Sequence, residues 1–333
     1  MLRVGVIGYG YWGPNLVRNF SSTENAKVVK ICDRRPDALK RAGKAQPNID
    51  RVSDDDEIMN SGDIDAVVIA TPVSTHFDLA KRALENGKHI FVEKPFTSNA
   101  TQSEDLIELA DKNNLKIMVD HTFLFTSPVR KIKELIDDGQ LGELYYYDST
   151  RVNLGLFQHD VNVVWDLAPH DLSIMDFVIK DKPLAIAANG MAHLGNGLHN
   201  IAYVTVYFAK MIAHFNVNWI SPVKIRTTLI GGGKKMLVWN DLAADEKIKI
   251  YDKGIDVKNG EGVYDLLVSY RSGDMWVPKV EQTEALKIET EYFVRCVSNN
   301  ETPFNDGYAG LRVVKMLEAC TKSLEKDGKP ISL

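Results

Sequence analysis

Val4-Gly5-Val6-Ile7-Gly8-Tyr9-Gly10-Tyr11-Trp12-Gly13 carries the pattern G-x-G-x-x-G directly after a strand-like run, and Pro14 follows in the first turn of a predicted helix. Gly8 permits the tight turn, Gly10 lets a pyrophosphate approach the backbone, and Gly13 lets the helix lie close to the strand. The phosphates then meet the positive end of that helix. The stretch therefore predicts a parallel, dinucleotide-binding (Rossmann) sheet at the start of the chain.

Asp33 supports this interpretation, because it stands at the end of the second predicted strand, twenty residues after Gly13. A carboxylate there can accept hydrogen bonds from the adenosine ribose hydroxyls, which favours NAD. Arg34 and Arg35 follow directly and can attract a 2′-phosphate. NADP therefore stays an alternative to NAD.

The first 120 residues alternate short apolar runs with helical patterns, which is typical of a doubly wound sheet. We expect its strands near 3–7, 28–32, 65–70, 88–92 and 116–120. From residue 143 longer strands follow one another, near 143–153, 184–192, 200–209, 211–219, 224–230, 235–240 and 247–252, and helices near 282–299 and 308–325 end the chain. The predicted fold class is α/β: an N-terminal Rossmann sheet, then a C-terminal α+β domain with a large, mostly antiparallel sheet.

We place the two domains at residues 1–122 and 123–333, with the C-terminal helix as a candidate to pack back on the first domain. Alternation of apolar and polar residues in the second domain indicates that one face of its sheet packs inward. We expect Tyr207, Phe215 and Trp219 on the other, freer face. A face of this kind must contact something.

The composition argues against several classes of partner. A net charge of −5 offers no basic surface for nucleic acid, and no stretch approaches the ~20 apolar residues that span a bilayer. Cys32, Cys296 and Cys320 lack metal-ligand spacing, so we expect no metal and a reduced, cytoplasmic compartment. The first strand begins at residue 2 or 3, which leaves no room for an export signal.

Lys94, in Glu93-Lys94-Pro95, directly follows a strand-like run. The residue at the carboxyl end of such a strand points into the crevice where a nucleotide lies. An isolated lysine is more often a surface residue that caps a turn. Together with the glycine turn, however, Lys94 suggests hydride chemistry with an ammonium group at the reacting oxygen.

Asp166-Leu167-Ala168-Pro169-His170-Asp171 is the second candidate for chemistry. Pro169 suits the first turn of a helix, which would put His170 in that turn, where the positive end of the helix disfavours the imidazolium. Asp166 lies four residues earlier and can orient the ring, leaving a neutral base at pH 7. Taken alone, this pair is more often a helix cap beside a hydrogen-bonded histidine.

These motifs, with Ala70-Thr71-Pro72, His76 and Gly87-Lys88-His89, resemble the glucose-fructose oxidoreductase and inositol dehydrogenase family over nearly the whole chain. The resemblance implies a catalytic group of Lys94, Asp166 and His170 and a cis Lys94-Pro95 bond. Beyond the three glycines and Asp33, cofactor contacts are expected from Tyr11, Trp12, Arg34, Thr71, Pro72, His76, Glu93, Lys94 and His121. Many relatives carry an asparagine and an arginine near residues 119–123, which this chain lacks, so sugar contacts from that loop stay open.

The runs 151–156, 160–162 and 165–171, with Gly273-Asp274 and Pro278, are similar to the nucleotide-sugar branch of this family, the 3-dehydrogenases of UDP-N-acetylglucosamine or its uronate. This similarity implies substrate contacts from Lys94, Arg151, Asn153, Asp166 and His170. Arg151 can offer a planar fork to a phosphate or carboxylate, and a strand arginine paired with a surface acid is an equal alternative.

The functional hypothesis is NAD-dependent oxidation of the 3-hydroxyl of a UDP-linked amino sugar to the 3-keto sugar. One alternative is a 3-keto nucleotide-sugar reductase or an inositol or glucose dehydrogenase, since sequence does not set the direction. Another is a sugar or NAD sensor without turnover. We expect a small-molecule nucleotide sugar as partner, and a homodimer or homotetramer formed through the C-terminal sheet.

Overall fold

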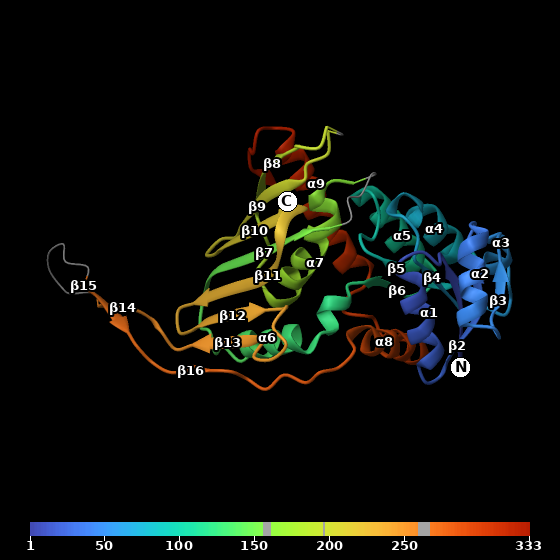
Figure 1. Ribbon diagram of the computed structural model, residues 1–333, viewed down its shortest axis with the longest axis horizontal. Coiled ribbons are helices and arrows are strands. Elements are labelled where there is room, and N and C mark those ends of the chain that lie inside the picture. Colours follow the sequence, from blue (N-terminus) through green and yellow to red (C-terminus); the bar gives the residue numbers. More distant parts are fainter. Residues whose placement is uncertain (156–160, 196, 259–266) are drawn as a thin grey trace. The chain divides into compact units, whose positions relative to one another are not determined.

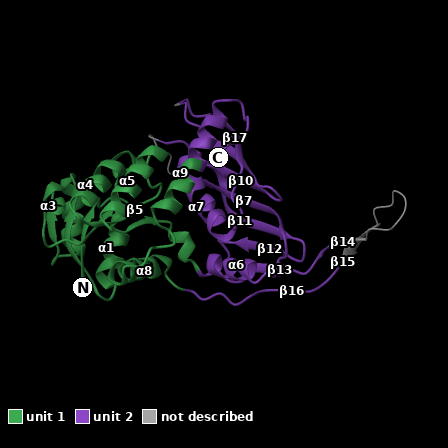
Figure 2. Ribbon diagram, turned by 180° about the vertical axis from the view of Figure 1, so that it is seen from behind, with its two compact units in different colours: residues 1–126, 283–315 green, residues 127–282, 316–333 purple. Residues whose placement is uncertain are grey.

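The computed structural model describes residues 1–155, 161–195, 197–258 and 267–333. It divides the chain into two compact units (Figure 2). Unit 1 comprises residues 1–126 and 283–315, and unit 2 comprises residues 127–282 and 316–333. The chain therefore leaves unit 1 and later returns to it.

Unit 1 is built on a six-stranded, wholly parallel sheet of order β3-β2-β1-β4-β5-β6. The strands are β1 Leu2–Ile7, β2 Ala26–Cys32, β3 Asp50–Val52, β4 Ala66–Ile69, β5 His89–Glu93 and β6 Ile117–Asp120. The strand order reverses direction between β1 and β4, which is the topological switch point at which such sheets bind nucleotides. The predicted Rossmann sheet is confirmed. Only the short β3, which has no apolar run, escaped prediction.

Helices lie on both faces of this sheet (Figure 1). They are α1 Gly13–Ser22, α2 Pro36–Ala45, α3 Asp56–Met59, α4 His76–Glu85, α5 Ala100–Lys112, α8 Ala285–Asn299 and the start of α9 Gly307–Leu324, with 3₁₀ turns at Val73–Thr75 and Thr122–Phe125. α8 packs against α1, where Phe20, Phe91 and Phe293 meet edge to face. Because each aromatic ring buries a large apolar area, this cluster holds the returning segment onto unit 1.

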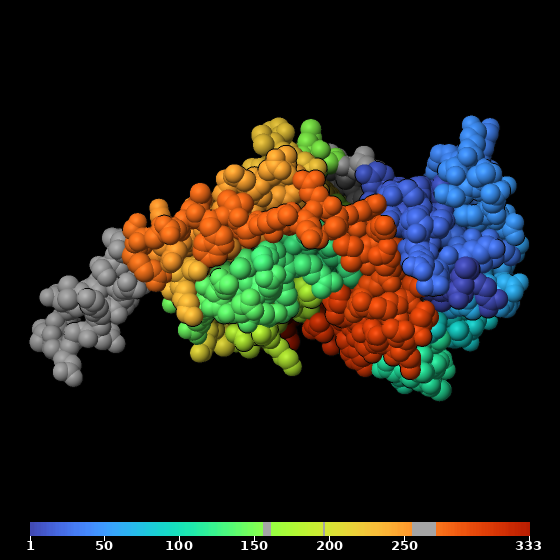
Figure 3. Space-filling view, turned by 90° about the horizontal axis from the view of Figure 1, so that it is seen from below, coloured from blue at the N-terminus to red at the C-terminus, as the bar shows by residue number. Residues whose placement is uncertain are grey.

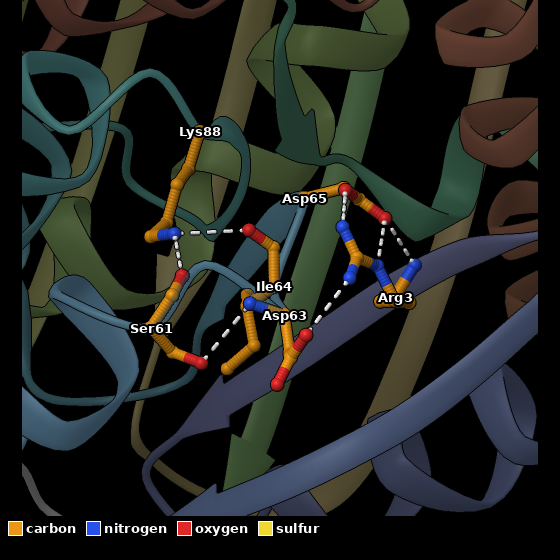
Figure 4. A network of polar contacts seen from close by, with 6 residues as sticks. All are labelled: Arg3, Ser61, Asp63, Ile64, Asp65 and Lys88. Atoms are coloured by element: carbon orange, nitrogen blue, oxygen red, sulfur yellow. Dashed lines mark hydrogen bonds and ion pairs between the residues drawn. The ribbon is translucent and has the colours of Figure 1, made fainter.

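The amino-terminal edge of the sheet is held by an internal polar network (Figure 4). Lys88 is buried, and its ammonium donates to the carbonyls of Ser61 at 2.6 Å and Ile64 at 2.9 Å. Arg3 donates to the carboxylate of Asp65 at 2.7 and 3.0 Å. The Lys88 ammonium is thus satisfied by backbone carbonyls, and Arg3 by the Asp65 carboxylate. Lys88, although part of the motif that precedes Lys94, has a structural role.

Unit 2 contains a nine-stranded sheet of order β16-β13-β12-β11-β7-β10-β9-β8-β17. Its strands are β7 Leu144–Leu154, β8 Ala185–Met191, β9 Ile201–Tyr207, β10 Ile212–Asn218, β11 Ile220–Gly232, β12 Met236–Asn240, β13 Ile248–Tyr251, β16 Met275–Trp276 and β17 Ile331–Ser332. β7 and β10 pair in parallel and the other neighbours pair antiparallel. The mostly antiparallel sheet is confirmed. β14 Gly254–Lys258 and β15 Leu267–Arg271 form a separate two-stranded sheet.

Two helices of unit 2 are α6 Ser127–Asp137 and α7 Val163–Val178, and α9 ends in this unit. α7 packs against β7, β9 and β10 on one face of the sheet (Figure 1). The segment that contains β16 runs beside α6, as orange and green atoms in Figure 3. Within the described ranges, no helix is both long and apolar enough to cross a membrane.

The two faces of the large sheet differ in part from expectation. Tyr207 is 37% exposed on the outer face, as predicted. Phe215 and Trp219 are instead buried, so their placement on the freer face was wrong. The register of the strands explains this: Phe215 pairs with Val204, an inward-facing residue of β9, so its side chain also points inward. Trp219 lies an even number of residues after Phe215, directly beyond the end of β10, and points to the same face.

Candidate cofactor and catalytic site

The glycine turn shows which of its glycines serve the fold and which leaves room for a ligand. Gly8 has a positive φ of 100°, and a Cβ there would collide with the carbonyl of Ala70. A Cβ on Gly13 would collide with the carbonyl of Gly8. A Cβ on Gly10 would meet nothing closer than Nη2 of Arg35 at 3.7 Å. Bare backbone beside open space at the start of α1 fits the pyrophosphate of a dinucleotide.

Asp33 lies directly after β2, at the position predicted for ribose recognition. Its carboxylate accepts from the backbone amide of Tyr9 at 2.8 Å and from the amide and guanidinium of Arg35 at 2.9 to 3.1 Å. Burial alone would raise the pKa of Asp33, but these donors together hold it below its usual value. The carboxylate is therefore ionised at neutral pH, and Arg35 covers both of its oxygens.

Arg34, the next predicted contact, is highly exposed, and its guanidinium lies 3.4 Å from Asp55. The Asp55 carboxylate also forms an ion pair with the Arg82 guanidinium, with Nη1 of Arg82 2.6 Å from Oδ1 of Asp55. Asp54, Asp55 and Asp56 are close enough together to suggest a cation site. Because two guanidinium groups already match the Asp55 charge, this cluster is better explained as an arginine-paired turn after β3.

Thr71, Pro72 and His76 lie after β4, next to β1 in the sheet. The His76 ring is buried and contacts the carbonyls of Thr71 and Pro95, each at 2.9 Å. Burial lowers the pKa of His76. The ring therefore links the turn after β4 to the turn after Lys94.

Glu93 ends β5, and Lys94 follows it at the carboxyl edge of the sheet. The Lys94-Pro95 bond is cis, as the family resemblance implied. The backbone amide of Lys94 donates to the Glu93 carboxyl at 3.1 Å, and Phe96 directly after the turn is buried. This turn therefore has a fixed backbone, and Lys94 stands where the sequence placed it.

His121 follows β6, the strand beside β5. It is 1% exposed, and neither ring nitrogen has a hydrogen-bond partner among the described residues. Burial, with a smaller contribution from Lys94, lowers the pKa of His121 to about 4 despite the nearby Asp120. The imidazole is therefore neutral at pH 7, with one donor and one acceptor that a ligand can satisfy.

α7 begins earlier than the sequence suggested. Asn162 caps the helix by accepting from the amides of Val164 and Trp165 at 3.0 and 3.2 Å. Pro169 lies inside the helix, so the prediction that His170 occupies its first turn was wrong. Proline is favoured at a first turn but is also found within helices, which made the motif a poor boundary marker. Because His170 does not lie in the first turn, the positive end of the helix cannot be the reason for a neutral imidazole.

Asp166 has a partner that sequence reasoning missed. Its Oδ2 accepts from the indole nitrogen of Trp219 at 2.9 Å. Trp219 follows β10 and is 2% exposed, so the donor is buried, while Asp166 itself is half-buried. The buried donor fixes the carboxylate one helical turn before His170. Asp166 is thus held by the sheet as well as by its own helix.

Arg151 on β7 has an internal partner. Its Nε and Nη2 donate to the Asp171 carboxylate at 2.6 and 3.0 Å, and both side chains are 4% exposed. The alternative of an exposed arginine paired with a surface acid was therefore wrong. The fork that was considered for a substrate phosphate binds α7 instead, next to His170. Asn153 is half-buried on the same strand, and Asp160 of the neighbouring motif lies outside the described residues.

The predicted residues thus divide between the two units. Unit 1 holds the predicted cofactor contacts and Lys94, at the carboxyl ends of β1, β2, β4, β5 and β6. Unit 2 holds Arg151, Asn153, Asp166 and His170, on β7 and α7. No sequence signal marked Trp219, because an indole that holds a carboxylate from another element follows no local spacing.

Two family models match the chain. The model described as an oxidoreductase family with an NAD-binding Rossmann fold covers residues 2–121, and the GFO/IDH/MocA C-terminal domain covers residues 129–237. The chain belongs to the GFO/IDH/MocA oxidoreductase family. The resemblance drawn from the motifs is confirmed, and residues 2–121 are the NAD-binding domain of this family.

Among curated relatives, an inositol 2-dehydrogenase from Rhizobium meliloti is 24% identical and the alignment covers 97% of each chain. A UDP-N-acetylglucosamine 3-dehydrogenase from Acidithiobacillus ferrooxidans is 25% identical over 94% of each chain. The first two relatives are uncharacterized oxidoreductases, and the chain spans about half their length, 51% and 55%.

The solved structure of the Acidithiobacillus ferrooxidans enzyme has a TM-score of 0.81 at 22% identity and covers 98% of both chains. An oxidoreductase from Agrobacterium radiobacter, in complex with NAD+, L-tartaric acid and magnesium, has a TM-score of 0.82 at 17% identity and covers 99% of this chain and 98% of that one. At these identities the likeness establishes the fold of the two domains alone.

Proposed function

We propose that this oxidoreductase oxidises a secondary hydroxyl of a sugar with NAD as the cofactor. The glycine turn and Asp33 would hold NAD, which would supply a hydride acceptor for the carbinol carbon. The observation that carries the proposal is the pairing of the open turn at Gly10 with Lys94 at the carboxyl edge of one parallel sheet. This edge is where α/β sheets of this topology bind their ligands.

We assign the proton and the charge to side chains of this chain. His170 takes the hydroxyl proton as general base, and Lys94 stabilises the oxygen as negative charge develops on it. Asp166, held by Trp219, orients the imidazole. His121 is a neutral hydrogen-bonding group for the cofactor, since its buried imidazole lacks a described partner. In the reverse direction His170 returns the proton as an acid.

The proposed substrate is a UDP-linked amino sugar, UDP-N-acetylglucosamine or its uronate, oxidised at its 3-hydroxyl. Support comes from the motifs between residues 151 and 171 and from the near full-length similarity to a UDP-N-acetylglucosamine 3-dehydrogenase. The similarity to an inositol 2-dehydrogenase, of almost equal identity, favours a free polyol as the second candidate.

The substrate test is a panel of UDP-sugars and free polyols, each mixed with enzyme and NAD, followed by the near-ultraviolet absorbance of the reduced nicotinamide. Turnover of UDP-N-acetylglucosamine well above that of inositol and glucose supports the nucleotide sugar. Turnover of inositol alone would indicate that the substrate is a free polyol. Tight NAD binding without an absorbance change for any sugar contradicts catalysis and favours a sensor.

We further propose that the chain assembles through the outer face of its nine-stranded sheet. Tyr203, Tyr207 and Ile212 lie on this face at 48%, 37% and 45% exposure, on the adjacent strands β9 and β10. Exposed apolar side chains grouped on a flat sheet are typical of protein contacts. Light scattering of purified protein tests this: a Tyr207→Glu variant should shift the mass toward the monomer, and an unchanged oligomer would contradict the proposal.

A further inference from the structure

Three carboxyl groups, those of Glu93, Asp120 and Glu289, lie close together in unit 1, beside the turn that contains Lys94. Glu93 and Asp120 end the adjacent parallel strands β5 and β6 and are paired in register. Glu289, on α8, is fully buried and lies against Asp120, as does Glu93, and Oε1 of Glu93 and Oε2 of Glu289 have no hydrogen-bond partner among the described residues. The group therefore joins two strand ends near the start of the domain to a helix near the end of the sequence.

The hydrogen bonds around Asp120 distinguish it from the two glutamates. Asp120 accepts from the indole nitrogen of Trp12 at 2.9 Å and from the hydroxyl of Thr122. An ionised carboxyl only accepts, so Glu93 and Glu289 can bond it only as protonated acids that donate. Burial, together with Asp120, raises the pKa of both glutamates well above the ordinary value. Asp120 thus accepts from two described donors, whereas each glutamate has a buried oxygen without a described partner.

The other groups around the cluster are consistent with one negative charge. Lys94 follows Glu93, and the neutral His121 follows Asp120. Asn305 donates to Glu289 at 3.3 Å. Burying three carboxylates together would be prohibitive, whereas a hydrogen-bonded carboxylate flanked by two acids is tolerable.

Trp12 connects this cluster to the cofactor turn. It stands between Gly10 and Gly13 and is the N-cap residue of α1, so its backbone belongs to the turn that receives the pyrophosphate. It caps the helix without a side-chain hydrogen bond, and the indole points its N–H at Asp120 instead. The hydrogen bond that holds the Trp12 side chain therefore also restrains the backbone of the glycine turn.

We propose that Asp120 and Glu289 are positioning residues of the NAD site: the Asp120 carboxylate anchors the Trp12 indole and with it the glycine turn, while Glu289 acts as a protonated hydrogen-bond donor that holds Asp120 in place. The inference rests on the proposed function only in its use of NAD. No sugar enters the test, so failure of the substrate proposal and failure of this one are distinguishable.

The test compares Asp120→Asn, Trp12→Phe, their double variant and Glu289→Gln by calorimetric NAD titration. Asp120→Asn and Trp12→Phe should each weaken NAD binding about tenfold or more, the usual effect of a lost hydrogen bond to a charged group. The double variant should be no weaker than the worse single variant, because both remove one interaction. If the losses of NAD affinity in the two single variants add up in the double variant, the anchoring role is refuted. If Asp120→Asn does not fold, Trp12→Phe alone still tests whether the indole is needed for NAD binding.

Glu289→Gln separates a protonated acid from a carboxylate, because an amide keeps the donor and the shape. It should bind NAD within about threefold of wild type. A raised folded pKa means that wild-type stability is lost as pH rises from the ordinary glutamate value toward the folded one. The variant should therefore melt above wild type at alkaline pH, with a flatter pH profile. Loss of NAD binding to the level of Asp120→Asn would overturn the proposal. Glu291→Gln, an exposed position on the same helix, is the matched control and should change neither quantity.

Discussion

Gly10→Ala should leave the fold intact and remove most of the NAD affinity. The added methyl would lie 3.7 Å from Nη2 of Arg35, an ordinary contact, and Gly10 does not have a positive φ. An alanine at such a position leaves the free energy of unfolding unchanged or raises it by about 0.4–1 kcal/mol. The same methyl, however, occupies the space through which a pyrophosphate reaches the backbone amides.

The expected loss follows from the hydrogen bonds at stake. Excluding one backbone amide from a charged phosphate costs about 1.5–3 kcal/mol, which raises the dissociation constant of NAD roughly 10- to 150-fold. Calorimetric titration gives this constant, and thermal unfolding without ligand gives the stability. Gly62→Ala is the matched control, because a Cβ at Gly62 meets nothing within 4 Å.

Gly13→Ala is the contrasting variant. Its Cβ would collide with the backbone carbonyl of Gly8, so it should lower the melting temperature as well as NAD affinity. If Gly10→Ala binds NAD as tightly as the Gly62→Ala control, the turn does not receive the pyrophosphate. The assignment of the cofactor site would then be refuted.

Three further variants test separate contacts. Trp219→Phe removes the donor to Asp166 and should lower turnover about tenfold while the NAD dissociation constant stays unchanged; a loss of NAD affinity would contradict that role. Arg35→Leu should weaken NADP binding about tenfold or more and leave NAD within about threefold, and equal losses for both cofactors would contradict a 2′-phosphate contact. Arg151→Met leaves the Asp171 carboxylate buried and unmatched, so urea unfolding should show a loss of about 3–5 kcal/mol, and a loss below about 1 kcal/mol would refute the internal ion pair.

The sequence predicted the structure well at positions where only one backbone conformation or one packing environment explains the residue type. Gly8 and Gly13 mark a turn that no side chain can enter, and the apolar runs of β1 and β4 predict buried parallel strands. The alternation of periods two and 3.6 separated the two kinds of sheet. These local signals were sufficient for the fold class and for the position of Lys94.

Prediction failed where distant elements decide the outcome. Trp219 donates to Asp166, and Trp12 donates to Asp120, from elements far along the chain. No spacing rule links such pairs, because register and helix return are set by tertiary packing.

The most direct test of the catalytic assignment is one single-turnover measurement on Lys94→Met. The variant is saturated with NAD and UDP-N-acetylglucosamine, and the near-ultraviolet absorbance of the reduced nicotinamide is followed beside wild type. We predict that the variant retains NAD binding and forms the reduced cofactor roughly a hundredfold or more slowly, by analogy with the loss of an oxyanion donor. Reduction at the wild-type rate would show that Lys94 does not stabilise the reacting oxygen.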